Sequence, residues 1–127
     1  MTADEITLTL PRSRDYYEIA HLILGGLAVR LDLTLEHLDD LQLALDGVLE
    51  RHEGDDSVTV TVRVDGDSIH TVVGPFPANR LRGELERDQG EHLGLRRLLD
   101  TVCDDVQVEE RGDTEWIELT KSVQAAV

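Results

Sequence analysis

Residues 38–53, LDDLQLALDGVLERHE, form the longest amphipathic stretch of the chain. Thr34 precedes the stretch as a favourable N-cap, and Glu53-Gly54 is a typical helix stop. The spacing therefore predicts a central helix that turns one apolar face toward a core. That face is expected to carry Leu38, Leu41, Leu45, Val48 and, at its end, His52.

Further periodicities on both sides of this helix predict strands and two more helices. Asp65-Gly66-Asp67 is a tight hairpin signal between two of the strands. Residues 78–90, ANRLRGELERDQG, are mostly charged and leave two alternatives open, a solvated helix or a mobile loop. The expected strands are 6–10, 58–64, 69–73, 106–109 and 115–120, with 74–77 ending the third, and the expected helices begin after Ser13 and near Glu91.

These elements follow the order β-α-α-β-β-α-β-β. Hairpins favour a mixed, mostly antiparallel sheet, and the helices need one sheet face to cover their apolar stripes. The sequence therefore predicts an α/β (α+β) two-layer sandwich with the helices on one face. A chain of 127 residues suits a single domain, which we expect to span residues 1–127.

The charge of the chain restricts its partners. Asp and Glu total 27 against 12 for Lys and Arg, which gives a formal net charge of −15. A field of this sign repels nucleic acid and anionic membrane surfaces, and it favours basic partners. We therefore expect neither a nucleic-acid nor a membrane partner.

The cysteine and histidine content excludes several kinds of site. Cys103 is the only cysteine, so neither an internal disulfide nor a thiolate metal cluster can form. The five histidines show no metal-ligand spacing, so no metal site is expected. The N-terminal residues lack a signal-peptide pattern, and no apolar run is long enough to span a membrane. We expect a soluble, cytoplasmic protein.

Two motifs resemble those of a known family. The first is LALD at residues 43–46, followed after one residue by an apolar pair, and the second is Gly94-Leu95 at a helix start with Leu98-Leu99-Asp100 beyond it. Together they are similar to motifs of the anti-sigma-factor serine kinases, bacterial regulators with the Bergerat (GHKL, histidine-kinase-like ATPase) fold. The order of elements also matches from about residue 6 to residue 121. The resemblance therefore implies this fold for nearly the whole chain.

The catalytic positions of that family are altered in this chain. In the family, LALD is typically followed by a Glu that activates the attacking hydroxyl and, four residues later, by an Asn that holds magnesium. Gly47 and Arg51 stand at these two positions. The resemblance therefore implies that the motif has neither a catalytic residue nor a metal ligand, and no cofactor is expected.

The nucleotide motifs are altered as well. No Asp occurs between Ser68 and Arg87, so the family's adenine-reading carboxylate has no candidate. If a nucleotide such as Mg-ATP binds at all, the resemblance assigns its contacts to Gly74, Gly90, Gly94, Leu95 and Thr114.

Neighbouring residues of the central helix offer a second interpretation. Asp46 and Glu50 have the same spacing of four as the altered pair and could take over its roles in an active kinase. A helix turns about 100° per residue, however, so Asp46 is expected to point away from the site. Arg51 could bind a phosphate directly or form a surface ion pair.

The resemblance implies a regulatory protein-binding domain, a pseudokinase that resembles an anti-sigma factor. Its implied partners are a sigma factor or an anti-sigma-factor antagonist, and the family also implies a homodimer. Two alternatives stay open: an active ATP-binding protein serine kinase with displaced catalytic residues, and a small-molecule-binding domain on the same fold. Trp116 is one step out of phase with Ile117 and Leu119, so we expect it to face away from the core as a contact residue.

Overall fold

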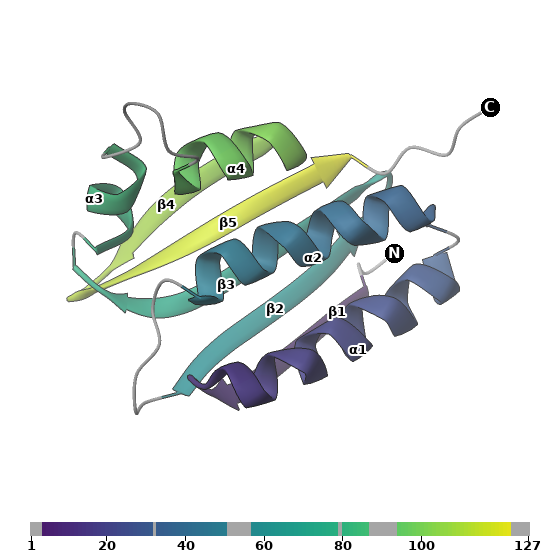
Figure 1. The fold of residues 1–127 in the computed structure, drawn as a ribbon, viewed down its shortest axis with the longest axis horizontal. Coiled ribbons are helices and arrows are strands. Elements are labelled where there is room, and N and C mark those ends of the chain that lie inside the picture. The colour runs from purple at the N-terminus through teal and green to yellow at the C-terminus, as the bar shows by residue number, and fades with distance from the viewer. Residues whose placement is uncertain (1–3, 32, 51–56, 79, 87–93, 123–127) are drawn as a thin grey trace.

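The computed structural model describes residues 4–31, 33–50, 57–78, 80–86 and 94–122. Its centre is a five-stranded sheet in the order β1-β2-β3-β5-β4, in which every neighbouring pair is antiparallel. β1 and β4 are therefore the two edge strands (Figure 1). The strands are β1 (Asp4–Pro11), β2 (Ser57–Asp65), β3 (Ser68–Pro77), β4 (Asp105–Arg111) and β5 (Thr114–Ser122).

The described helices lie on one face of this sheet (Figure 1). They are α1 (Arg14–Leu31), α2 (Leu35–Leu49), α3 (Arg80–Glu86) and α4 (Leu95–Val102). α1 and α2 run side by side in opposite directions, and α4 packs beside α2. The arrangement confirms the predicted two-layer sandwich. None of these helices is long and apolar enough to cross a lipid bilayer.

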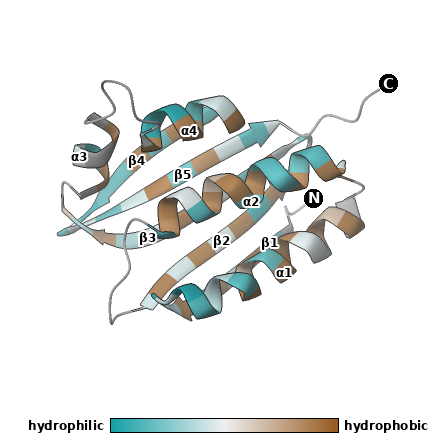
Figure 2. Cartoon of the chain, in the orientation of Figure 1, coloured by the Kyte–Doolittle hydropathy of each residue, from teal (hydrophilic) through white to brown (hydrophobic). Residues whose placement is uncertain are grey.

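Alternation along the strands builds the core between the two layers. Val58, Val60 and Val62 of β2 are buried beneath the helices, and Figure 2 shows the alternating brown and pale bands along this strand. On the opposite face, threonine hydroxyls pair across β1 and β2, with Oγ1–Oγ1 distances of 3.1 Å for Thr7–Thr61 and 3.0 Å for Thr9–Thr59. α2 buries Leu41, Leu45 and Val48 along the stripe predicted for it.

α2 begins at its predicted N-cap. The Oγ1 atom of Thr34 accepts a hydrogen bond from the backbone N–H of His37 at 3.1 Å. The α-helix ends at Leu49, with Glu50 as its C-cap, and the expected stop at Glu53-Gly54 lies outside the described residues. Residues 51–56, which include Arg51 and His52, lie outside the described residues.

β3 extends further than predicted. The pattern placed its end at Val73, but the strand continues through Gly74 and Pro75 to Pro77. A register shift between Val73 and Phe76 accommodates the proline, which has no N–H to donate to the ladder. The hairpin predicted at Asp65-Gly66-Asp67 forms, with Gly66 at φ 61°, where glycine is favoured. A second tight hairpin joins β4 to β5, with Gly112 at φ 63°.

The charged segment at 78–90 contains a packed helix. α3 buries Leu81 completely, so the helical alternative was correct for residues 80–86, and this helix is anchored rather than merely solvated. α4 begins at Leu95 instead of near Glu91, because Gly94 is its extended N-cap at φ −79° and ψ 172°. Residues 87–93 lie outside the described residues.

Candidate functional site

The elements that carry the family-like motifs converge at one end of the sheet. The C-terminal half of α2, the N-terminus of α4 and the helix α3 lie near the end of β3 and the start of β5 (Figure 1). Pro77 at the end of β3 is the partner of Thr114 at the start of β5. The candidate site is therefore the junction between α2 and α4, with α3 beside it.

Gly47 is a point of close contact between α2 and α4. It is buried, and a Cβ atom added to it would lie 2.5 Å from Cδ2 of Leu98 and 3.7 Å from Cδ1 of Leu95. A side chain at position 47 would need the space that the end of the half-buried Leu98 side chain now occupies. The position that the resemblance assigns to a general base is a packing glycine against two leucines.

The acidic residues that flank Gly47 lie on the other side of α2. Oδ1 of Asp46 is 2.7 Å from Nε2 of His21 in α1, and both side chains are about one-third exposed. Glu50 is exposed, and its Oε1 lies 4.0 Å from a guanidinium nitrogen of Arg14. Both carboxylates thus pair with residues of the α1 segment, whereas Gly47 faces α4.

A buried arginine holds the irregular part of β3. Arg12 follows the end of β1, and its Nη2 donates a hydrogen bond to the carbonyl oxygen of Pro75. Its guanidinium carbon lies 4.8 Å from the centre of the Phe76 ring, which is a cation–π distance. The sequence pattern carried no signal for this role, because the contact joins residues that are 63 positions apart.

A buried glutamate anchors α3 over the end of the sheet. Glu115 is fully buried, and its Oε1 accepts a hydrogen bond of 2.8 Å from the backbone N–H of Leu81. Its Oε2 lies 3.6 Å from Nε of Arg82, whose Nη1 is 2.9 Å from Glu110. A carboxylate at the first turn of a helix pairs with N–H groups that have no partner within the helix. Sequence analysis missed this role, although Glu115 shares the alternation phase of Ile117 and Leu119.

The remaining motif residues are only partly brought together. Leu95 is buried beside Gly47, and Gly94 caps the same helix. Thr114 donates a hydrogen bond of 2.8 Å to the carbonyl oxygen of Arg111 across the β4–β5 turn. Gly90 lies outside the described residues, so its position stays a prediction.

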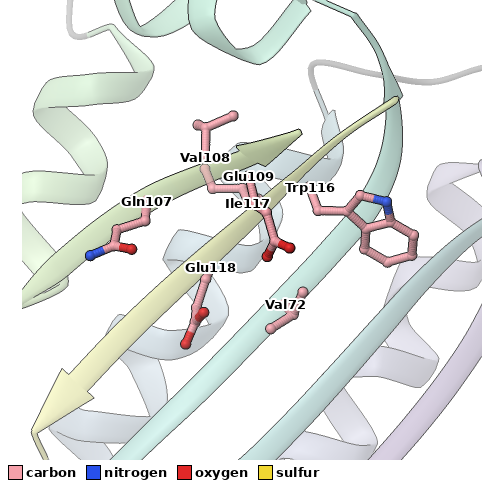
Figure 3. A pocket seen from close by; sticks show the side chains of 7 residues that line it. All are labelled: Val72, Gln107, Val108, Glu109, Trp116, Ile117 and Glu118. Carbon is pink, nitrogen blue, oxygen red and sulfur yellow. The ribbon is translucent and has the colours of Figure 1, made fainter. Parts of the chain in front are cut away.

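Gly74 is buried beneath an aromatic ring on the helix-free face. A Cβ atom added to it would overlap the indole of Trp116, which extends from β5 toward β3 in Figure 3. Trp116 therefore faces away from the core, as its phase predicted, and the guanidinium of Arg111 lies 4.6 Å from its ring centre. Gly74 serves this packing on the opposite face of the sheet from the α2–α4 junction.

Beside Trp116 the helix-free face has a shallow hollow of about 270 Å³. Figure 3 shows Val72 and the side chains of Gln107, Glu109 and Glu118 around it. Small-molecule sites usually range from about 300 to 1,000 Å³ and are more enclosed.

Comparisons with known proteins identify the family. The serine-protein kinase RsbW of Listeria innocua is 30% identical to this chain over 128 residues, which cover 83% of this chain and 79% of that protein. The chain belongs to the RsbW family of anti-sigma-factor serine kinases. RsbW of Listeria monocytogenes is 27% identical over 124 residues, with the same shares covered. No family model matches the chain.

A solved structure shares the fold of this RsbW-family chain. The crystal structure of the RsbU and RsbW domains of a Mycobacterium tuberculosis protein superposes with a TM-score of 0.68 at 13% identity. The match covers 94% of this chain and 32% of the mycobacterial one, so this chain spans about a third of that protein's length. The similarity confirms the predicted histidine-kinase-like ATPase (Bergerat) fold.

Proposed function

We propose that this RsbW-family chain is a regulatory protein-binding domain that acts without transferring phosphate, as a pseudokinase. The observation that carries the proposal is the packing of Leu98 on Gly47. Family membership supports a regulator of the anti-sigma type, and the altered position at the centre of the kinase motif supports the loss of catalysis.

The chemistry of phosphoryl transfer explains why this packing matters. A kinase positions a base within hydrogen-bond reach of the attacking hydroxyl and holds magnesium through oxygen ligands. The three atoms nearest to a Cβ added at Gly47 are aliphatic carbons of Leu98 and Leu95. Asp46 is hydrogen-bonded to His21 on the α1 side of α2, so it is poorly placed to replace the missing base. The aliphatic contacts at Gly47 and the position of Asp46 therefore support a domain that binds no magnesium–nucleotide complex.

The partners we propose follow from the family and the charge. A sigma factor or an anti-sigma-factor antagonist in a bacterial cytoplasm is the expected class of partner, and a homodimer is the expected assembly. A formal charge of −15 favours a basic partner surface and accelerates association at low ionic strength.

Calorimetric titration with ADP and with a non-hydrolysable ATP analogue, with and without magnesium, tests the proposal. We expect no heat of binding up to millimolar nucleotide, because leucine side chains pack against the position of the missing general base. The Listeria innocua RsbW protein titrated under identical conditions is the matched control. Micromolar, magnesium-dependent binding would overturn the proposal.

A kinase assay completes this test. Transfer of phosphate to a partner serine, abolished by Asp46→Ala or Glu50→Ala, would establish the active kinase with displaced catalytic residues. Nucleotide binding that is indifferent to magnesium would instead support a direct contact between Arg51 and a phosphate. We expect neither result.

A further inference from the structure

The outer edge of β4 is open in the part of the chain that the structure describes. β4 pairs with β5 along its whole length, from Asp105 opposite Thr120 to Arg111 opposite Thr114, and no described strand pairs with its other side. Every second residue of an antiparallel edge strand points its backbone N–H and C=O groups away from the sheet, where an extended chain can bind them. The β4 edge is therefore a candidate site for strand addition.

On the helix-covered face of the sheet, β4 adjoins a groove of about 370 Å³. Val106 and Val108 of β4 line this groove together with Leu85 of α3. The two valines lie opposite the buried Leu119 and Ile117 of β5, so they point to the same face as the core. All three lining residues are only partly buried, so an apolar side chain placed in the groove would complete their burial.

The two arginines at this groove already have carboxylate partners. Nη1 of Arg82 lies 2.9 Å from Oε1 of Glu110, and its Nε lies 3.6 Å from the buried Glu115. Nη1 of Arg96 lies 3.8 Å from Oδ1 of Asp100. Because these carboxylates balance both charges, the arginine stems add aliphatic surface to the groove. The groove therefore favours an apolar side chain over an acidic one.

On the helix-free face, the same strand adjoins the hollow beside Trp116. Gln107 and Glu109 point to this face, because they lie opposite Glu118 and Trp116 of β5. Figure 3 shows the carboxylates of Glu109 and Glu118 on the same side of the sheet as the indole ring. Glu118 is about one-third exposed, although its Oε2 lies 3.0 Å from Nδ1 of His70. Carboxylates beside an aromatic ring attract an ammonium or guanidinium group.

A basic side chain of the chain itself shows what this face can hold. The guanidinium of Arg111 lies 4.6 Å from the centre of the Trp116 ring, and its Nε lies 3.3 Å from Oε1 of Glu109. Asp105, at the other end of β4, is exposed and adds a carboxylate to the same face. The helix-free face beside the open edge therefore favours basic side chains.

We infer that β4 binds an extended segment of a partner protein as a sixth strand of the sheet, with apolar side chains on the helix-covered face and basic side chains on the helix-free face. Successive residues of a strand point to opposite faces, so the two kinds alternate along the segment. Val108 lines both the groove and the hollow, so neighbouring residues of one segment can reach both.

The charge of the whole chain supports this choice of occupant. A net charge of −15 attracts a basic segment, whereas a second copy would bring two strongly acidic chains together. The inference rests on the proposed role in protein binding, and it adds the edge that recognises the partner and the chemistry of the bound segment.

A model peptide tests the strand addition directly. Trp116 is the only tryptophan of the chain and lines the hollow, so its fluorescence reports binding there. The probe is a peptide of about seven residues in which lysine and valine alternate, and titration of the Trp116 emission gives its Kd. The matched control carries N-methyl groups on its three central residues, which keeps the side chains and removes the backbone donors. We expect the control to bind about tenfold more weakly or not at all.

Charge variants separate local recognition from general attraction. Glu109→Gln with Glu118→Gln should raise the Kd of the alternating peptide about threefold or more at low salt, and less at high salt. Glu36→Gln with Asp39→Asn removes the same charge from α2 and should change the Kd less than twofold. Equal binding of the two peptides, or equal effects of the two charge pairs, would overturn the inference.

Other results would assign the edge differently. A dimer in analytical ultracentrifugation that an excess of the alternating peptide dissociates would assign the β4 edge to a second copy of the chain and overturn the inference. Magnesium-dependent ATP binding would overturn the proposed pseudokinase while leaving the peptide results intact. Equal binding of the N-methylated peptide would overturn strand addition while leaving the pseudokinase proposal intact, so the two failures are distinguishable.

Discussion

The two sides of α2, together with the helices beside them, differ in whether their apolar residues are buried or exposed. On the α4 side, Gly47 brings the helices together and Leu95 and Leu99 are buried. On the outer side, Leu43 and the α1 residues Leu22 and Val29 are exposed. Similar side chains thus stabilise the fold at one place and remain exposed at the other. The α2–α4 junction that carries the family-like motifs is therefore packed, whereas the exposed apolar residues lie on α1 and on the side of α2 that faces away from α4.

The largest expected effect is the loss of stability when a buried leucine is removed from α4, the helix that packs on α2. Leu99→Ala should lower the free energy of unfolding by about 2–5 kcal/mol, because Leu99 is fully buried and its removal leaves a cavity. Leu22→Ala should change that free energy by no more than about 0.5 kcal/mol, because Leu22 is exposed. Urea unfolding with equal m-values measures both. Similar losses of unfolding free energy in the two variants would show that Leu22 is buried and not exposed.

A smaller effect is expected from restoring a carboxylate at the altered position. Gly47→Glu should destabilise the chain by about 2–4 kcal/mol, because it places a charge against Leu95 and Leu98. Adding Leu98→Ala should recover about 1 kcal/mol or more relative to the sum of the single changes. Leu43→Glu, on the outer side of the same helix, is the matched control and should cost little. Strict additivity in the double-mutant cycle would contradict the close packing of α4 on Gly47.

The smallest effect concerns the buried thiol of Cys103, the residue that caps the C-terminus of α4. Burial raises the pKa of Cys103 from an ordinary value of 9.0 to about 11. Between these values the folded chain keeps a proton that the unfolded chain has lost, so stability falls as the pH rises. From pH 8 to pH 9.5 this loss should be below about 1 kcal/mol.

Comparison with a variant isolates the thiol from other groups that titrate in alkaline solution. The difference in unfolding free energy between the unmodified chain and Cys103→Ala should narrow over that pH range. Leu22→Cys in the Cys103→Ala background should react rapidly with a thiol reagent at pH 8, whereas Cys103 itself should react slowly. Rapid reaction of Cys103 would mean that the packing around the C-terminus of α4 opens readily and exposes the thiol.

Local patterns predicted the elements that depend on neighbours along the chain. Thr34 caps α2, the valines of β2 alternate in and out, and Trp116 faces away from the core. Helix and strand periodicities account for all three. The ends of elements were less predictable, because the continuation of β3 past Pro75 depends on what the segment packs against.

Contacts between distant segments escaped sequence analysis. Arg12 on the Pro75 carbonyl and Glu115 on the N–H of Leu81 join residues with no local signal for a partner. The same holds for Leu98 on Gly47, which turns a substituted motif position into a packing contact.

By itself, the sequence determined the fold class, the central helix and the altered kinase motif, because periodicity and residue identity are properties of the chain alone. Only the tertiary structure decided that α4 packs on Gly47 and that Leu22 and Val29 of α1 are exposed. An apolar stripe has the same pattern whether a neighbour covers it or not. Its burial depends on which distant segments the sheet brings beside it.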